Sequence, residues 1–131
     1  MFSLHPQLEK DSILLGKLSL CQVRLLADSD HPWVLLVPVK ENIKEIHELT
    51  EDEQVTLIKE ISKVSKAFEV LFNPDKINVG ALGNMVPQLH VHIICRFQGD
   101  RSWPGAIWGT ERSQDEEKIK SQIELLKNTL F

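Results

Sequence analysis

Apolar residues in the first third of the chain fall in short runs, a pattern that predicts β-strands. Residues 12–28 (SILLGKLSLCQVRLLAD) are rich in apolar and β-favouring types and contain positions for a bend, so they predict two strands. The run Trp33–Val39 (WVLLVPV) is almost continuously apolar, which predicts a third strand buried on both faces. Between them, Asp28–Pro32 has the composition of a turn, because Asp and Ser bond their own backbone and Pro fixes φ.

The apolar spacing changes to a helical period after Thr50. Thr50 and Glu53 have the spacing of a capping box, and apolar residues then recur at helical intervals as far as Phe72. The pair Asn73-Pro74 ends the pattern, because proline cannot continue a helix. The sequence therefore predicts one long amphipathic helix of about six turns.

The remaining patterns predict two strands and a last helix. The strands are Lys76–Gly83 (KINVGALG) and Leu89–Phe97 (LHVHIICRF), and the helix follows Gln114, where apolar and charged residues alternate at helical spacing. Strands and helices come in blocks, which indicates an α+β class with helices packed on an antiparallel sheet. A chain of 131 residues is long enough for one domain, so we expect a single domain over 1–131.

The charge of the chain excludes one class of partner. The formal net charge is −4 and the pI is about 5.7, and the Lys and Arg residues are scattered along the chain. Binding to DNA or RNA phosphates uses a basic patch, so we expect no nucleic-acid partner. A mononucleotide is compatible with this charge, because a few local donors and backbone amides can hold a phosphate.

Hydropathy and cysteine content indicate the compartment. No segment approaches the roughly 20 apolar residues that a membrane helix needs, and the N-terminal residues have no apolar signal-peptide core. Cys21 and Cys95 lie in separate apolar segments, which favours buried free thiols over a disulfide. We expect a cytoplasmic protein that does not bind a membrane.

Two histidines share one face of the predicted strand Leu89–Phe97. Because side chains alternate across a strand, Gln88, His90, His92 and Arg96 point to one side and an unbroken set of apolar residues points to the other. The apolar side would pack on the core and keep the strand rigid. We therefore expect the two imidazoles to be held rigidly on an exposed face.

Three interpretations of this pair compete. They can be ordinary polar residues of a solvated sheet face, or ligands of a metal ion. Zinc usually takes three protein ligands, and the other histidines (His5, His31 and His47) lie in segments with no evident route to this face. The third interpretation is phosphorus chemistry, in which one imidazole is the nucleophile and the other handles a proton. Imidazole suits this role because its ordinary pKa is about 6.5. We favour it and expect neither metal nor cofactor.

The segment KINVGALGNMVPQLHVHIICR resembles the signature of the histidine triad superfamily, where three histidines alternate with apolar residues after a glycine-rich turn. The order of the other predicted elements is also similar to this family over most of the chain. Trp103-Pro104-Gly105 resembles the nucleoside phosphoramidase branch, and dinucleoside polyphosphate hydrolases are a related branch. The resemblance implies a five-stranded antiparallel sheet with one long helix and a C-terminal helix, paired into a homodimer.

The resemblance also implies roles for individual residues. His90 is similar to the nucleophile that forms a covalent nucleotidyl-histidine, and His92 to the histidine that contacts the phosphate and the leaving group. The family implies nucleotide-binding positions at Asp28 (for the ribose hydroxyls), Asn78, Gly83 and Asn84 (for the phosphate). We also expect Trp33 to bind the nucleotide, because its ring could stack on the base.

Three residues depart from the family pattern. Gln88 stands at the place of the first histidine, Met85 where a phosphate-binding Ser or Thr is common, and Trp33 where many members have an upstream histidine. The backbone carbonyl of residue 88 is unaffected by the change of side chain, so it can still orient His90. We expect Gln88 to belong to the catalytic set and the reaction class to be retained.

Some of these positions have simpler interpretations. Asp28 and Asp30 can be plain turn residues, and Trp33 can line a pocket rather than stack on a base. The segment 101–109 (RSWPGAIWG) is either an apolar loop packed on the sheet or a flap over the nucleotide or over the partner subunit's site.

Two functions follow from the resemblance. The first is a nucleotide hydrolase or nucleotidyl transferase that acts at the α-phosphate of a purine nucleotide derivative through a nucleotidyl-His90 intermediate. The second is a nucleotide-sensing protein that kept the pocket and lost most activity. Turnover of an adenosine phosphoramidate or a dinucleoside polyphosphate separates the two.

Overall fold

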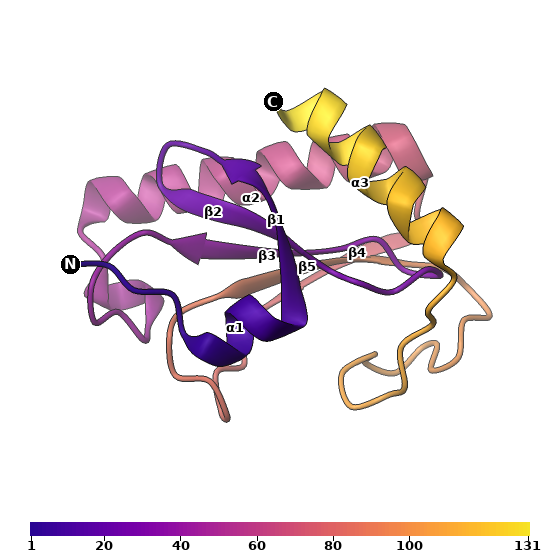
Figure 1. Ribbon diagram of the computed structural model, residues 1–131, viewed down its shortest axis with the longest axis horizontal. Helices are drawn as coiled ribbons and strands as arrows, with labels where there is room; N and C mark the ends of the chain where they lie inside the picture. Colours follow the sequence, from indigo (N-terminus) through magenta and orange to yellow (C-terminus); the bar gives the residue numbers. More distant parts are fainter.

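The computed structural model describes residues 1–131 and contains a five-stranded antiparallel sheet with helices on both faces (Figure 1). The strand order is β1-β2-β3-β5-β4. The strands are β1 (Ser12–Lys17), β2 (Cys21–Leu26), β3 (Trp33–Pro38), β4 (Lys76–Gly80) and β5 (Val91–Arg96). The helices are α1 (Pro6–Asp11), α2 (Glu51–Phe72) and α3 (Glu116–Leu130), with a short 3-10 helix at Ile46–Glu48. The α+β class and the five-stranded antiparallel sheet are confirmed.

Strand β3 lies in the centre of the sheet, between β2 and β5. All six of its residues are buried, as its continuous apolar run predicts. Helix α2 stabilises the turn of the β1–β2 hairpin. The Glu60 carboxylate accepts hydrogen bonds from the backbone N–H groups of Leu20 at 2.8 Å and Cys21 at 3.0 Å. One helix residue therefore satisfies two backbone donors at the β1–β2 turn.

Local sequence signals set the two ends of α2. The Thr50 hydroxyl accepts the Glu53 N–H at 3.2 Å, and the Glu53 carboxylate accepts the Thr50 N–H at 2.9 Å, which is the expected capping box. The helix ends at Phe72 and is capped by Asn73, which is in the left-handed region with φ of 48°, directly before Pro74. The short helix α1 has no sequence prediction, because six residues are too few to show a helical period.

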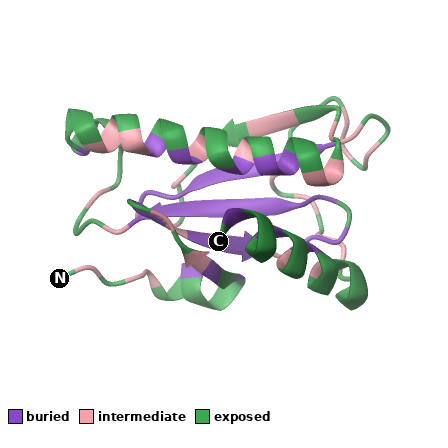
Figure 2. Ribbon diagram, turned by 90° about the horizontal axis from the view of Figure 1, so that it is seen from above, coloured by how far each residue is buried: buried purple, intermediate pink, exposed green.

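The sheet has a different cover on each face. Helices α2 and α3 lie over one face and enclose the larger core, while α1 and the loop after β5 lie along the other (Figure 1). Along α2 the buried positions face the sheet and the outer side is exposed (Figure 2). The second face encloses a smaller apolar cluster of six residues, which are Leu8, Trp33, Leu35, Val37, Ile94 and Ile107.

The cover on the second face corrects one expectation. His90 and His92 lie on this face, and each is only 8% exposed, so the histidine face is not a solvated surface. The covering segments are the N-terminal residues and the loop after β5. The predicted strands 76–83 and 89–97 are also too long, because residues 81–90 form an irregular turn in which Gly83 has φ of 66°.

The last features of the fold are its cysteines and the apolar character of its helices. Cys21 and Cys95 are both fully buried and free, and burial raises the pKa of each thiol. None of the helices combines the length and the apolar character that crossing a membrane would require.

Candidate active site

His90 is oriented by the backbone two residues before it. Its Nδ1 lies 2.7 Å from the carbonyl oxygen of Gln88. A carbonyl oxygen can only accept a hydrogen bond, so Nδ1 carries the proton and donates it. In the neutral ring, Nε2 then has the free lone pair, which is the arrangement that a nucleophilic imidazole needs.

His92 is held in the opposite tautomer. The indole Nε1–H of Trp33 donates a hydrogen bond to Nδ1 of His92 at 2.9 Å. An indole N–H is only a donor, so Nδ1 has the lone pair and Nε2 carries the proton in the neutral ring. The two imidazole centroids are 5.1 Å apart. The two neighbouring rings therefore provide a lone pair on Nε2 of His90 and a proton on Nε2 of His92.

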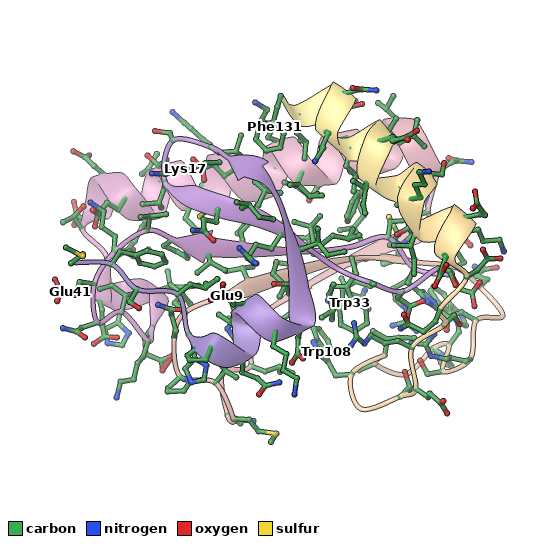
Figure 3. All side chains as sticks on the ribbon, in the orientation of Figure 1. Glu9, Lys17, Trp33, Glu41, Trp108 and Phe131 are labelled. Carbon is green, nitrogen blue, oxygen red and sulfur yellow. The ribbon has the colours of Figure 1, made fainter.

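An aromatic wall of Trp33 and Trp108 encloses His92. The Trp108 ring centroid lies 5.5 Å from His92 and 6.4 Å from Trp33, with nearly perpendicular planes. Figure 3 shows the two tryptophans close together on the side of the sheet where the loop after β5 runs. Gly80, the β4 partner of His92, leaves room for this wall, because a Cβ there would lie 3.1 Å from the Trp108 ring.

The expected base-stacking role of Trp33 is corrected by its burial. Trp33 is 3% exposed and belongs to the apolar cluster of the second face. A nucleotide base cannot stack on the Trp33 ring, because protein atoms already cover both of its faces. Of the two interpretations open from the sequence, the structure supports a residue in the pocket wall.

The Gln88 side chain does not face His90 as a catalytic group. Its Oε1 accepts the backbone N–H of His5 at 2.8 Å, and its Nε2 donates to the carbonyl of Ser3 at 2.9 Å. These bonds fasten the N-terminal arm, which we define as residues 1–5, beside the histidine pair. The expected catalytic contribution of Gln88 is therefore limited to its backbone carbonyl. A hollow of about 420 Å³ lies between the arm, Pro87, Gln88 and residues 41–44.

Asp28 is committed to ion pairs rather than open for a ribose. It is fully buried, and its Oδ1 accepts the Asp30 N–H at 3.0 Å while its Oδ2 accepts Arg101 Nη2 at 2.6 Å. Its Oδ1 also lies 3.4 Å from the ring Nδ1 of His31. Burial acts to raise its pKa, but the hydrogen bonds from His31 and Arg101 prevail and lower the pKa to about 2. The expected contact with ribose hydroxyls is corrected, because both oxygens are already engaged.

Asn78 belongs to a second buried group around Arg96. Arg96 is 2% exposed; its Nη1 donates to Asn78 Oδ1 at 2.9 Å, and its Nε donates to Asp100 Oδ2 at 2.8 Å. Arg96 also donates to the backbone carbonyl of Gly105 at 2.8 Å, so it fastens the loop after β5 to the sheet. The expected place of Asn78 beside the nucleotide is corrected, since its oxygen serves Arg96.

His31 joins these two groups. Its Nε2 lies 2.9 Å from Asp100 Oδ2, while its Nδ1 faces Asp28. Burial alone would lower the pKa of His31, but the hydrogen bonds and charges of the two carboxylates prevail and raise it. Arg96 donates to Asp100 and holds the pKa of that carboxyl far below its usual range. The result is a continuous network of hydrogen bonds and ion pairs from Asn78 to Arg101, with Arg96, His31 and Asp28 buried at its centre.

Gly83 and Asn84 lie in the turn that precedes β5. The positive φ of Gly83 allows the chain to reverse there, and Asn84 is exposed at the tip. Together with Lys44 and His47 they line a hollow of about 330 Å³. The structure thus brings together His90, His92, Trp33 and the Gln88 carbonyl, and it places Asp28 and Asn78 in the separate ionic network.

The sequence pattern and this fold agree with one protein family. The family model described as the HIT domain matches residues 7–99. The chain belongs to the HIT domain family. The matched part of this HIT domain includes all five strands and both histidines of the pair.

Solved structures similar to this HIT domain include three histidine triad proteins. The protein from Bradyrhizobium japonicum is 42% identical, with a TM-score of 0.94 and coverage of 99% of this chain and 98% of that one. The protein from Marinobacter aquaeolei is 46% identical, with a TM-score of 0.93 and coverage of 99% and 96%. The protein from Sinorhizobium meliloti is 41% identical, with a TM-score of 0.91 and coverage of 98% and 97%. No curated protein matches the chain.

Sequence reasoning missed several residues around the site of this HIT domain. Trp108, Asp100 and Arg101 all lie in the loop after β5. The sequence analysis interpreted residues 101–109 only as an apolar loop or a flap, and it assigned no role to Asp100. The one available signal was the density of Trp, Arg and Asp in residues 100–108. No group of three His, Cys, Asp or Glu side chains in the structure could hold a metal ion.

Burial of His92 predicts that this residue destabilises the fold in mild acid. Burial lowers the pKa of His92 to about 4, with a further lowering by the charge of His90. The unfolded chain binds a proton at this residue below its ordinary pKa of about 6.5, whereas the folded chain does so only near 4. The contribution of His92 to stability is therefore complete above about pH 6.5 and decreases with falling pH, by about 2 kcal/mol between pH 7 and pH 5.

Urea unfolding of the wild type and of His92→Asn at these two pH values measures this contribution. The variant should lose about 2 kcal/mol less than the wild type over the same interval. The raised pKa of His31 acts in the opposite direction over this interval, but His31 is present in both proteins, so its contribution cancels in the comparison. Equal losses in both proteins would contradict the assignment.

Proposed function

We propose that this HIT domain is a nucleotide hydrolase or nucleotidyl transferase that acts at the α-phosphate of a purine nucleotide derivative. The observation that carries the proposal is the pairing of opposite tautomers on neighbouring rings: His90 has its lone pair on Nε2, His92 has its proton on Nε2, and the ring centroids are 5.1 Å apart. One group can attack phosphorus while the other donates to a phosphoryl oxygen. The family match supports the same chemistry.

In the first step, His90 Nε2 forms a bond to the α-phosphorus as the bond to the leaving group breaks. The leaving group departs with its electron pair and takes a proton from water. His90 is then bonded at Nε2 and protonated at Nδ1, so its ring is cationic, and the Gln88 carbonyl at 2.7 Å stabilises that charge. In the second step, water or another hydroxyl acceptor forms a bond to the phosphorus as the bond to His90 Nε2 breaks and its electron pair returns to the ring. The proton lost by the acceptor neutralises the hydroxide left by the first step, and His90 is again neutral.

His92 and the preceding turn stabilise the charge that develops on the phosphoryl oxygens. The His92 Nε2–H keeps its proton and donates a hydrogen bond, and such preorganised donors contribute about 3 kcal/mol each. We assign the phosphate to the Gly83-Asn84 turn, whose backbone N–H groups and exposed Asn84 amide are available donors. Neither step needs a metal ion.

A nucleotide-sensing role is the second candidate. It is favoured by one observation, the small exposure of His90 and His92, which are 8% exposed each beneath the N-terminal arm and the Trp108 wall. Restricted access would slow substrate entry and product release, which limits turnover without preventing binding.

The deciding experiment measures turnover of an adenosine phosphoramidate and of a dinucleoside polyphosphate by protein dialysed exhaustively against a chelator. We expect the dialysed protein to hydrolyse the substrate at the same rate as protein that was not dialysed. We also expect an acid-labile nucleotide adduct in the mass spectrum. Loss of activity to the chelator and its return with added metal would contradict the mechanism, because a metal site depends on the metal. Binding without turnover would favour the sensing role.

We also predict a homodimer in solution. Strand β4 is at the edge of the sheet, and it presents Val79, which is 49% exposed, near Leu82, which is 50% exposed. A bare apolar edge promotes aggregation, and pairing with a second copy removes this risk. Sedimentation should give about twice the 15.0 kDa of one chain, and Val79→Lys should shift it toward the monomer. A wild-type mass near one chain at all concentrations would contradict the prediction.

A further inference from the structure

We propose that Trp33 is a positioning residue for the reaction, because its indole N–H fixes His92 in the neutral form that carries a proton on Nε2. The proposal rests on the function proposed above. Trp33 touches neither the phosphate nor the nucleophile in this arrangement; it acts through His92.

The contact between the two side chains is enclosed. Trp33 Nε1 and His92 Nδ1 are 2.9 Å apart, and the residues are 3% and 8% exposed. Water therefore has little access to Nδ1, and the indole is its partner. Since the indole has no acceptor, the bond exists only while Nδ1 keeps its lone pair.

The orientation of the indole is set by packing and by the sheet. Trp33 is the first residue of β3 and pairs with Ile94 of β5, two residues after His92. Its ring packs in the cluster with Leu8 and Ile107 and meets Trp108 at an interplanar angle of 89°. The donor is thus preorganised, and it does not need to be ordered when a substrate binds.

Protonation of His92 is opposed by the same contact. A proton on Nδ1 would face the indole N–H, so the cation could form only by breaking the bond. The groups packed against His92 are His90 on its own strand, Gly80 on β4, Leu35 on β3 and the two tryptophans, and His90 is the one ionisable group among them. The lowered pKa of His92 agrees with this arrangement.

A matched pair of Trp→Phe variants tests the proposal. Trp33→Phe removes an N–H that bonds His92, whereas Trp108→Phe removes an N–H from the same wall that has no hydrogen-bond partner. The imidazole ¹⁵N and ¹H resonances of His92 report its tautomer and its protonation between pH 5 and pH 8, with or without activity.

We expect the wild type and Trp108→Phe to show a single Nε2–H tautomer of His92 that does not titrate in this range. In Trp33→Phe, His92 should show a mixture of tautomers and a protonation midpoint at least one pH unit higher. With the phosphoramidate substrate, kcat of Trp33→Phe should fall about tenfold with little change in KM, and its acid limb should move to higher pH.

Two results would overturn the proposal. One is a wild-type spectrum in which His92 carries its proton on Nδ1, a measurement that does not depend on the folding of any variant. The other is a Trp33→Phe spectrum identical to that of the wild type. If the wild type turns over neither substrate while its His92 spectrum is as expected, the proposed function fails and the tautomer assignment stands, so the two failures are distinguishable.

Discussion

Replacement of His90 by Ala is expected to abolish turnover and to eliminate the covalent adduct. No other side chain at the site combines a free lone pair with an orienting partner, because His92 Nε2 carries a proton and Gln88 is bonded to the N-terminal arm. Loss of a covalent nucleophile commonly reduces kcat by about 10⁴-fold or more. The measurement is single-turnover kinetics with a phosphoramidate, together with the intact mass of the protein after a short incubation.

The variant His92→Asn is the mechanistic control for His90→Ala. It keeps the nucleophile and its Gln88 partner, so it should still form the adduct, at a rate lower by about 10²-fold for the loss of a positioned donor. Nucleotide affinity and the unfolding midpoint of both variants should be measured, because each histidine is nearly buried. A His90→Ala rate above one tenth of the wild-type rate would remove His90 from the role of nucleophile.

Replacement of Arg96 by Met is expected to be the most destabilising single change. Arg96 is 2% exposed and donates to Asp100, Asn78 and the carbonyl of Gly105, so its loss leaves a buried carboxylate and two buried acceptors without their main donor. Removal of one partner of a buried ion pair costs about 3–5 kcal/mol. Chemical unfolding at pH 7 measures this loss.

A second arginine of the same network offers the control. Arg101→Met breaks the ion pair with Asp28, but the Arg101 side chain is 24% exposed and Asp28 keeps the donation from His31. Its loss of stability should therefore be clearly smaller than that of Arg96→Met. Equal losses would mean that the loop after β5 is fastened by something other than Arg96.

The network and the histidine pair are two parts of one arrangement. Arg96 and Asp100 fasten the beginning of the loop that later presents Trp108 to His92. We therefore expect Arg96→Met to lower kcat as well. The decrease in kcat should be larger under conditions in which the loop after β5 is less stable. The adduct should still form, because the bond from His90 to the Gln88 carbonyl lies outside the network.

Elements with strong local signals could be predicted from the sequence. The helix α2 was predicted at both ends, because a capping box, a helical period and an Asn-Pro stop lie within its own residues. The central burial of β3 followed from its apolar run. Helix α1 and the true lengths of β4 and β5 were not predicted, because short segments take their conformation from the segments that pack on them.

By itself, the sequence determined that His90 and His92 share a face, that the opposite face is apolar, and that the fold is a sheet with helices. These properties follow from the two-residue period of a strand and from local propensity. The tertiary structure alone decided which groups meet that face. Trp33 and His92 are 59 positions apart, His31 and Asp100 are 69 apart, and Asp28 and Arg101 are 73 apart. Partners of polar groups across such separations depend on strand order and loop paths, which no local pattern encodes.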